Sequence, residues 1–170
     1  MLEPLEESLA ALKRFGAATA SQQAVLDEVV RVVADTLAVP MCKILELTSD
    51  ASELVVRSGV GWQPGVIGVA KVSAKSDSQP GYTLVQGTLV LFDDLPRTLR
   101  FTGAALARRH GIVSSVCIPI GEPHPYGVLC AHDVKKRTFT PEERHFLRRV
   151  AAEVLHDLPT TDKHSNARRS

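Results

Sequence analysis

The chain has 170 residues, of which 44% are hydrophobic and 23% charged, and this size and composition suit one soluble domain with a full core. Its formal net charge of +1 argues against nucleic-acid or membrane-surface partners that would attract it by charge. No apolar run approaches the roughly 20 residues that span a bilayer, and the acidic start MLEPLEESLAALKRF lacks the features of a signal peptide.

Two helices are predicted before the first strand. Leu5–Phe15 carries an apolar stripe at 4-3-3 spacing, and Gly16 is expected to end this helix. Ser21 then caps a stronger helix, Gln22–Leu37, whose valines and leucines recur at i, i+3 and i+4. The first stripe has no obvious sheet to cover, so we expect it to build a homodimer.

Strands and a glycine-rich loop follow the helices. Met41–Leu47 and Glu53–Val60 are predicted as the first two strands of a meander, because both are short apolar runs separated by turn residues. Gly61–Gly68 contains three glycines and the only tryptophan, which favours a loop. Val69–Ala74 is expected to be a short extended segment.

The middle of the chain predicts short elements. Ser78 is expected to cap a short helix, Tyr82–Gln86, with Pro80 in its first turn. Thr88–Phe92 is predicted to be a strand. Phe101–His110 is predicted to be a helix, because basic residues followed by glycine are typical of a helix C-terminus.

The stretch over 112–133, IVSSVCIPIGEPHPYGVLCAHD, is predicted to be the centre of the fold. Its apolar runs, Val113–Ile120 and Tyr126–Ala131, flank a short polar link, which predicts an antiparallel hairpin. Both runs are too apolar for a sheet with one wet face, so the hairpin should be central and covered on both sides. Thr140 then caps a helix that runs to about Leu158. The polar tail over 159–170 should be disordered.

This order of elements predicts an α+β fold with helices on one face of an antiparallel sheet. Five phrases spread over about Gln22 to Leu158 resemble the GAF domain, a sensory module of phytochromes, cyclic-nucleotide phosphodiesterases and bacterial kinases. They are GVGWQPGVIG, DSQPGYTLVQGTLVLFDDL, RRHGIVSSVCIPI, YGVLCAHD and FTPEERHFLRRVAAEVL. The chain is therefore divided into an N-terminal helix and linker over 1–20, a GAF domain over 21–158 and a tail over 159–170.

The resemblance implies a central antiparallel sheet with the N- and C-terminal helices on one face, and a roof of loops and short helices over a ligand pocket on the other. Here the roof is Gly61–Gly111. The implied function is a regulatory sensor that binds a small molecule and signals through its flanking dimer helices, with another protein as a possible signalling partner. The alternatives are a structural homodimerisation module and a free methionine sulfoxide reductase. The sequence names no ligand or cofactor.

Three activities of known GAF domains depend on particular residues, whose presence can be checked in this sequence. Covalent bilin attachment needs a cysteine, and the matching stretch Arg100–Ala104 has none. The cyclic-nucleotide signature needs an asparagine, and the only one is Asn166, in the tail. The reductases carry their reactive thiol where this chain has Pro80, just before Gly81. We therefore expect no enzymatic activity.

Seven residues of the roof are the candidate ligand contacts. Aromatic rings beside glycines can stack on flat ligands or simply plug the roof, and the acidic and basic residues can fix a polar ligand or form surface ion pairs. His110 is expected to interact with the last carbonyls of its helix. The more specific alternative is that His110 serves as an axial haem ligand. The candidates are Trp62, Tyr82, Asp93, Asp94, Arg100, Phe101 and His110.

The three cysteines, Cys42, Cys117 and Cys130, lie inside apolar runs. Their odd number predicts reduced thiols and a cytoplasmic protein. Cys130 and His132 should share one strand face, where Cys117 or Cys42 could join them to hold a metal. No Cys-x-x-Cys spacing supports a metal, so we expect the thiols to pack as small hydrophobic groups.

Overall fold

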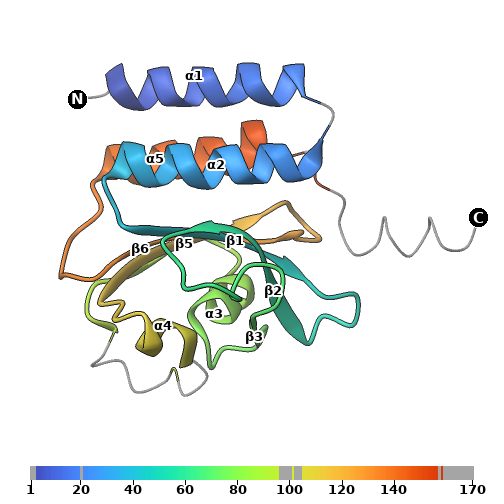
Figure 1. The fold of residues 1–170 in the computed structure, drawn as a ribbon, viewed down its shortest axis with the longest axis vertical. Coiled ribbons are helices and arrows are strands. Elements are labelled where there is room, and N and C mark those ends of the chain that lie inside the picture. The colour runs from blue at the N-terminus through green and yellow to red at the C-terminus, as the bar shows by residue number, and fades with distance from the viewer. Residues whose placement is uncertain (1–2, 20, 96–100, 102–104, 157, 159–170) are drawn as a thin grey trace, which may run out of the picture.

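A computed structural model describes residues 3–19, 21–95, 101, 105–156 and 158 of the chain. The strands are β1 Met41–Leu47, β2 Glu53–Val60, β3 Lys71–Ser73, β4 Val90–Phe92, β5 Ser114–Ile120 and β6 Gly127–Asp133. They form one antiparallel sheet in the order β3-β2-β1-β6-β5-β4. In Figure 1 helices lie on one face of this sheet, and short helices and loops lie on the other. The predicted α+β fold class is confirmed.

Local sequence signals place the helices. The side-chain oxygens of Ser21, Ser78 and Thr140 each accept a hydrogen bond from the backbone N–H three residues on, at 3.0 to 3.2 Å. These N-caps satisfy donors that the first helical turn leaves without partners. The helices are α1 Glu3–Ala18, α2 Gln22–Leu37, α3 Gln79–Gln86, α4 Ala105–Arg109 and α5 Pro141–Arg149, which continues as a π-helical segment, η2 Val150–Val154.

The hairpin of β5 and β6 is central, as predicted. Strand β6 pairs with β1 on one side and β5 on the other, and all seven of its residues are buried. Alternate side chains enter different cores: Leu129 and Ala131 pack toward the helices, whereas Val128 and Cys130 pack toward the roof. Burial on both faces favours apolar residues, which explains the hydrophobic run over the first five positions. The last two residues of β6, His132 and Asp133, are buried polar side chains.

Several predicted boundaries are wrong. Helix α3 begins at Gln79 rather than at Tyr82, and β4 begins at Val90 rather than at Thr88. The first helix does not end at Gly16 but continues to Ala18, because its buried leucines hold the helix on its neighbours despite the glycine. Phe101 is not helical; it is a buried residue outside α4 that packs on other aromatic rings. The last helix ends at Val154, although Leu158 is still buried against the helical core.

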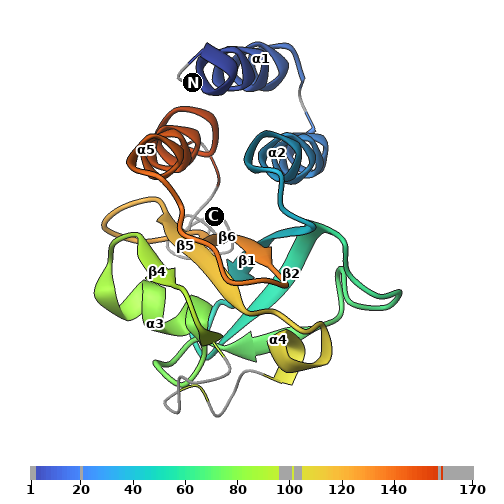
Figure 2. The ribbon, with the colours of Figure 1, turned by 90° about the vertical axis from the view of Figure 1, so that its left-hand side faces the viewer.

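Helix α1 does not lie on the sheet but on top of α2 and α5, as Figures 1 and 2 show. Leu9 and Leu12 are buried in this contact, and Ser8 Oγ lies 2.8 Å from Thr36 Oγ1 on α2. The first stripe has no sheet to cover, as expected, but α2 and α5 cover it. A homodimer is not needed to cover these leucines.

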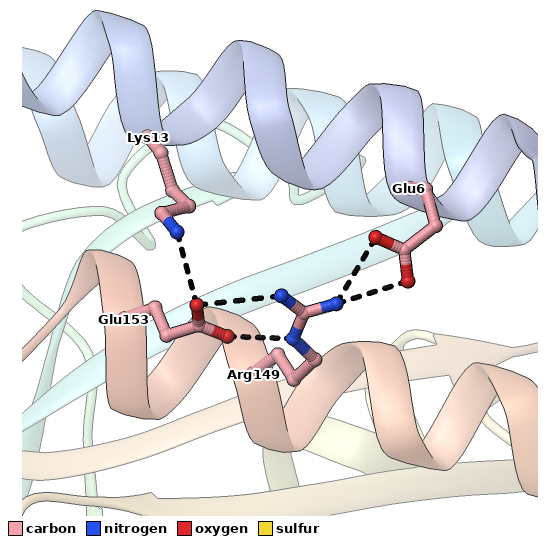
Figure 3. Close-up of polar contacts among 4 residues, drawn as sticks. All are labelled: Glu6, Lys13, Arg149 and Glu153. Carbon is pink, nitrogen blue, oxygen red and sulfur yellow. Dashed lines mark hydrogen bonds and ion pairs between the residues drawn. The ribbon is translucent and has the colours of Figure 1, made fainter.

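A network of four charged residues fastens α1 to α5 and η2 (Figure 3). Arg149 donates to both carboxylate oxygens of Glu6, at 2.9 and 3.0 Å, and to Glu153 at 2.6 Å. Lys13 donates to Glu153 at 3.0 Å. These hydrogen bonds lower the pKa of Glu153 to about 2, so this carboxylate stays charged at ordinary pH values.

Within the described residues, no helix combines the length and hydropathy of a membrane span. The tail over 159–170, predicted to be disordered, lies outside the described residues.

Candidate functional site

The roof lies on the face of the sheet opposite α2 and α5, where Figure 2 shows α3 and α4. Because side chains alternate along a strand, every second residue of β1, β5 and β6 points toward this roof. The pairing register then aligns these side chains in rows across the three strands. Lys43, Cys130 and Cys117 form one such row.

The neighbouring row consists of Met41, His132 and Ser115. Lys43 and His132 are therefore diagonal neighbours on adjacent strands, a separation that long side chains can span. Together the two rows place an amine, an imidazole, a hydroxyl and two thiols on the otherwise apolar face that the roof covers.

Lys43 is the largest polar side chain in the roof core. The residue is only 2% exposed, and its ammonium Nζ lies 4.6 Å from the centroid of the Trp62 ring. Burial lowers the pKa of Lys43, and the nearby thiols only partly oppose that shift. No carboxylate of the described residues enters its electrostatics. Lys43 is thus a buried base without an acidic partner in the described part of the chain.

His132 is fully buried beside it. Its Nδ1 lies 2.6 Å from Ser115 Oγ, whereas its Nε2 is buried and has no hydrogen-bond partner. Burial lowers the pKa of His132 well below its usual value, and the nearby Lys43 and His110 add to this shift. The ring is therefore neutral at pH 7, with one polar atom that no neighbour satisfies.

Trp62 joins these groups into one cluster, which we call the Trp62 cluster: Lys43, Trp62, His110, Ser115 and His132. The Trp62 indole meets the rings of His110 and His132 edge to face, with centroids 4.8 and 5.5 Å apart. Its Nε1 donates to the backbone oxygen of Cys42 at 2.9 Å.

Gly59 makes room for the indole, since a Cβ there would lie 2.7 Å from Trp62 Cδ1. The ring is thus fixed against the sheet, and only part of it is exposed.

Both ring nitrogens of His110 are engaged. Nδ1 lies 2.9 Å from the oxygen of Leu106 in the last turn of α4, and Nε2 accepts a hydrogen bond from the backbone N–H of Gln63 at 3.2 Å. The expected contact with a helix carbonyl is therefore present. A role as axial haem ligand would require one of these hydrogen bonds to break.

Two other sequence candidates gather at a second place in the roof. Tyr82 on α3 and Phe101 meet edge to face with their centroids 5.9 Å apart, and Phe92 lies 5.1 Å from Phe101. This aromatic trio lies at the β4 side of the sheet, where Phe92 pairs directly with Ser115 of the Trp62 cluster. The trio therefore adjoins the cluster within the same roof core.

The acidic candidates lie at the edge of the sheet after β4. Asp93 is exposed, and Asp94 is half-buried with an ion-pair distance of 3.9 Å to Lys136. Arg100 lies outside the described residues. Neither aspartate contacts the Trp62 cluster in any hydrogen bond or ion pair of the described residues.

The cysteines are free and buried, as predicted. Cys117 and Cys130 face the roof with His132, as expected, but Cys42 packs in the helix-side core and cannot join them. Burial raises the pKa of Cys42 and of Cys117. Among the described residues, no three histidine, cysteine or acidic side chains are grouped so as to hold a metal ion.

Sequence reasoning missed Lys43 and Ser115. The signal for Lys43 is visible in MCKILEL, where a charged residue occupies the same strand face as Met41 and Leu45. A charge at an inward position of an apolar strand is rare unless something pairs with it. Ser115 gives no comparable signal, because a serine at the start of a strand is common.

Hollows also exist on the helix side. One of about 470 Å³ lies where the end of α1 meets η2, and a second of similar volume lies between the β5–β6 link and η2. Their polar lining residues, such as Lys13, Glu153 and His156, are exposed or half-buried. The buried polar groups of the roof face make it the stronger candidate site.

Comparison with known proteins agrees with this geometry. The model of the GAF domain family matches residues 21–155. This chain belongs to the GAF domain family. The predicted family is therefore confirmed. No curated protein sequence matches the chain.

Solved structures show the same GAF fold. The GAF domain of a phosphoenolpyruvate-protein phosphotransferase from Coxiella burnetii has a TM-score of 0.80 at 16% identity, covering 99% of this chain and 96% of that one. The equivalent domain from Acinetobacter has a TM-score of 0.76 at 18% identity, covering 97% and 95%.

A free methionine-R-sulfoxide reductase from Neisseria meningitidis, solved with its substrate, has a TM-score of 0.75 at 15% identity, covering 97% of this chain and 90% of that one. At such identities the likeness shows a shared fold alone. The two phosphotransferase GAF domains and the reductase resemble this GAF domain about equally, so the fold alone does not distinguish an enzyme from a domain without enzymatic activity.

Proposed function

We propose that this GAF domain is a regulatory sensor that binds a small molecule against the roof face of its sheet. The observation that carries the proposal is the Trp62 cluster, in which two buried basic side chains, Lys43 and His132, have no acidic partner among the described residues. Burying polar groups without partners costs free energy. A ligand that pairs with them offsets this cost, and its binding can therefore change the conformation of the roof.

The signal would pass from the roof face to the helix face through β1. Lys43 points to the roof, whereas its chain neighbours Cys42 and Ile44 pack in the core beneath the helices. A shift of β1 toward a ligand therefore changes the packing of α2, on which α1 rests. We propose that a second copy of the chain or a signalling protein binds the outer surface of the helices and responds to this change in helix packing.

The three cysteines support a regulatory role over an enzymatic one. A reductase needs a reactive thiolate, and burial of Cys42 and Cys117 disfavours that form. The free thiols are consistent with the cytoplasmic location that the sequence predicts.

A ligand screen with two readouts tests the proposal. The probes are metabolite-sized compounds, the optical signal is the fluorescence of Trp62, the only tryptophan, and hydrogen exchange is then measured with each compound that responds. We expect binding to change Trp62 emission and to slow exchange across residues 61–111, while β5 and β6 stay protected with or without compound.

A roof that is fully protected in the free protein, with no response to any compound, would contradict the sensor proposal. That result would support the alternative, a closed structural module that serves homodimerisation.

A further inference from the structure

We infer that the small molecule carries a carboxylate or another compact anionic group, which Lys43 and His132 bind together beside Trp62. This inference rests on the proposed ligand-binding function and adds the chemical class of the ligand. The geometric basis is that both side chains contact one ring: Lys43 Nζ lies 4.6 Å from the Trp62 centroid, and the His132 ring lies 5.5 Å from it. Lys43 and His132 are also diagonal neighbours on β1 and β6, so their long side chains can reach a common ligand group.

One atom in this arrangement already lacks a partner. His132 Nε2 is buried without a hydrogen bond, although the opposite nitrogen, Nδ1, is held by Ser115. That hydrogen bond fixes the orientation of the ring, so Nε2 is presented in a defined direction. A protonated Nε2 and the ammonium of Lys43 are both donors, and donors of this kind match the oxygens of an anion.

Among the residues that the structure describes, no acid already fills this role. The titratable groups that act on Lys43 are the thiols of Cys42, Cys117 and Cys130, and those that act on His132 are Lys43 and His110.

Two further groups complete the neighbourhood. Asp133 is next in sequence to His132, but it points to the other face of the sheet and pairs with Arg137 at 3.7 Å. From α3, Thr83 reaches Cys117 and brings no charge. Among the described residues, the charged side chains beside the Trp62 cluster are thus all basic.

An anion would change the protonation of the cluster. Burial lowers the pKa of both Lys43 and His132 in the free protein, whereas a bound anion favours their charged forms and raises both values. Binding must then take up protons at pH values between the free and the bound pKa. The affinity should accordingly rise as the pH falls through that interval.

Matched pairs of acid and amide test the inference. The probes are propionate and propionamide, succinate and succinamide, and benzoate and benzamide, which differ in charge more than in shape. Binding is followed by Trp62 fluorescence and by calorimetry in two cationic buffers of different ionisation enthalpy, between about pH 6 and pH 10, a range that spans the ordinary values of histidine and lysine.

We expect at least one acid to bind about tenfold or more tightly than its amide, with proton uptake. Lys43→Met should reduce acid binding about tenfold or more. Lys71→Met, which removes the same charge from an exposed position on the edge strand β3, should leave it unchanged within about twofold. Circular dichroism confirms that both variants are folded.

Several results would overturn the inference. Equal binding of acids and amides, or unchanged acid binding by Lys43→Met, would mean that the ligand is not held by its charge, while the sensor function would stand. Failure of every acid to bind would also contradict the inference. In that case, a neutral molecule retained by protein purified from cells would leave the sensor function intact, and its absence would count against both.

Discussion

At the scale of residues, the chemistry of the roof face depends most on Lys43. Contact with the face of Trp62 contributes only about 0.5 to 2 kcal/mol to holding a cation. Removing an unpaired ammonium from water costs several kcal/mol, so the aromatic contact alone does not offset the cost. The free protein therefore keeps Lys43 at the expense of stability, which is expected of a residue retained for binding.

Replacing Lys43 by methionine should stabilise the free protein by about 1 to 3 kcal/mol near neutral pH, because the stem is kept and the buried base is removed. The pKa of Lys43 is lowered by folding. Between that value and about 10.4, the unfolded chain holds a proton that the native state lacks, so wild-type stability rises with pH relative to the variant. Denaturant unfolding of both proteins at several pH values measures the difference. A variant less stable than wild type at every pH would contradict this reading.

The thiols are expected to be structural. Cys42→Ala should be mild, whereas Cys42→Ser places a hydroxyl in the apolar helix-side core and should cost about 1 to 3 kcal/mol. Neither these variants nor a variant that lacks all three cysteines should lose a ligand response in Trp62 fluorescence. Thioredoxin-coupled reduction of free methionine sulfoxide by the wild type would show instead that a thiol is catalytic.

Ala38 offers an independent test of the backbone geometry. This exposed residue ends α2 in the left-handed conformation, with φ of 54° and ψ of 48°, which is unfavourable for any residue with a Cβ. Ala38→Gly should therefore raise the free energy of unfolding by about 1 kcal/mol. The matched control is Ala10→Gly on the exposed face of α1, which should lower it by about the same amount. Loss of stability in Ala38→Gly would contradict the assigned cap.

At the scale of elements, α1 is held by two kinds of contact of unequal strength. Leu9 and Leu12 are buried on the helices below, whereas the Arg149 network is solvent-accessible and open to screening by salt. Burial of apolar side chains should dominate, and the network should mainly fix the position of α1 along its neighbours. A displaced α1 would alter the surface that we propose for signalling.

Two variants separate these contributions. Leu12→Ala should destabilise the domain by about 2 to 5 kcal/mol, and Arg149→Met should change global stability much less. We expect Arg149→Met, or high salt, to speed hydrogen exchange in α1 while the sheet stays protected. If Arg149→Met destabilised the protein as much as Leu12→Ala, charge rather than apolar packing would be what holds α1.

Local signals allowed most elements to be predicted, and packing explains the errors. Caps at Ser21, Ser78 and Thr140 fixed helix starts, because the capping hydrogen bond is made within one turn. Gly16 failed as a helix end because the buried leucines outweigh its weak propensity. Phe101 failed as a helix residue because its place is set by Phe92 and Tyr82, which are distant in sequence.

At the scale of the whole molecule, the strand order was beyond prediction from local signals. Strands β1 and β6 pair although most of the domain's sequence separates Leu47 from Gly127. No residue pattern in either strand identifies the other as its partner. The same pairing brings Lys43 beside His132. The Trp62 cluster therefore exists only in the folded sheet, which is why the sequence predicted Trp62 and His110 but missed the lysine that lies over the Trp62 ring.

Native mass spectrometry of protein purified gently from cells tests the central claim most directly, because it reports retained ligand and oligomeric state together. The account predicts a species heavier than the 18.4 kDa chain by the mass of a small molecule, which is released on denaturation and is reduced in Lys43→Met. A homodimer would appear in the same spectrum at twice the chain mass. The bare polypeptide mass in wild type and variant alike, with no gain after incubation with cell extract, would contradict a ligand-binding roof.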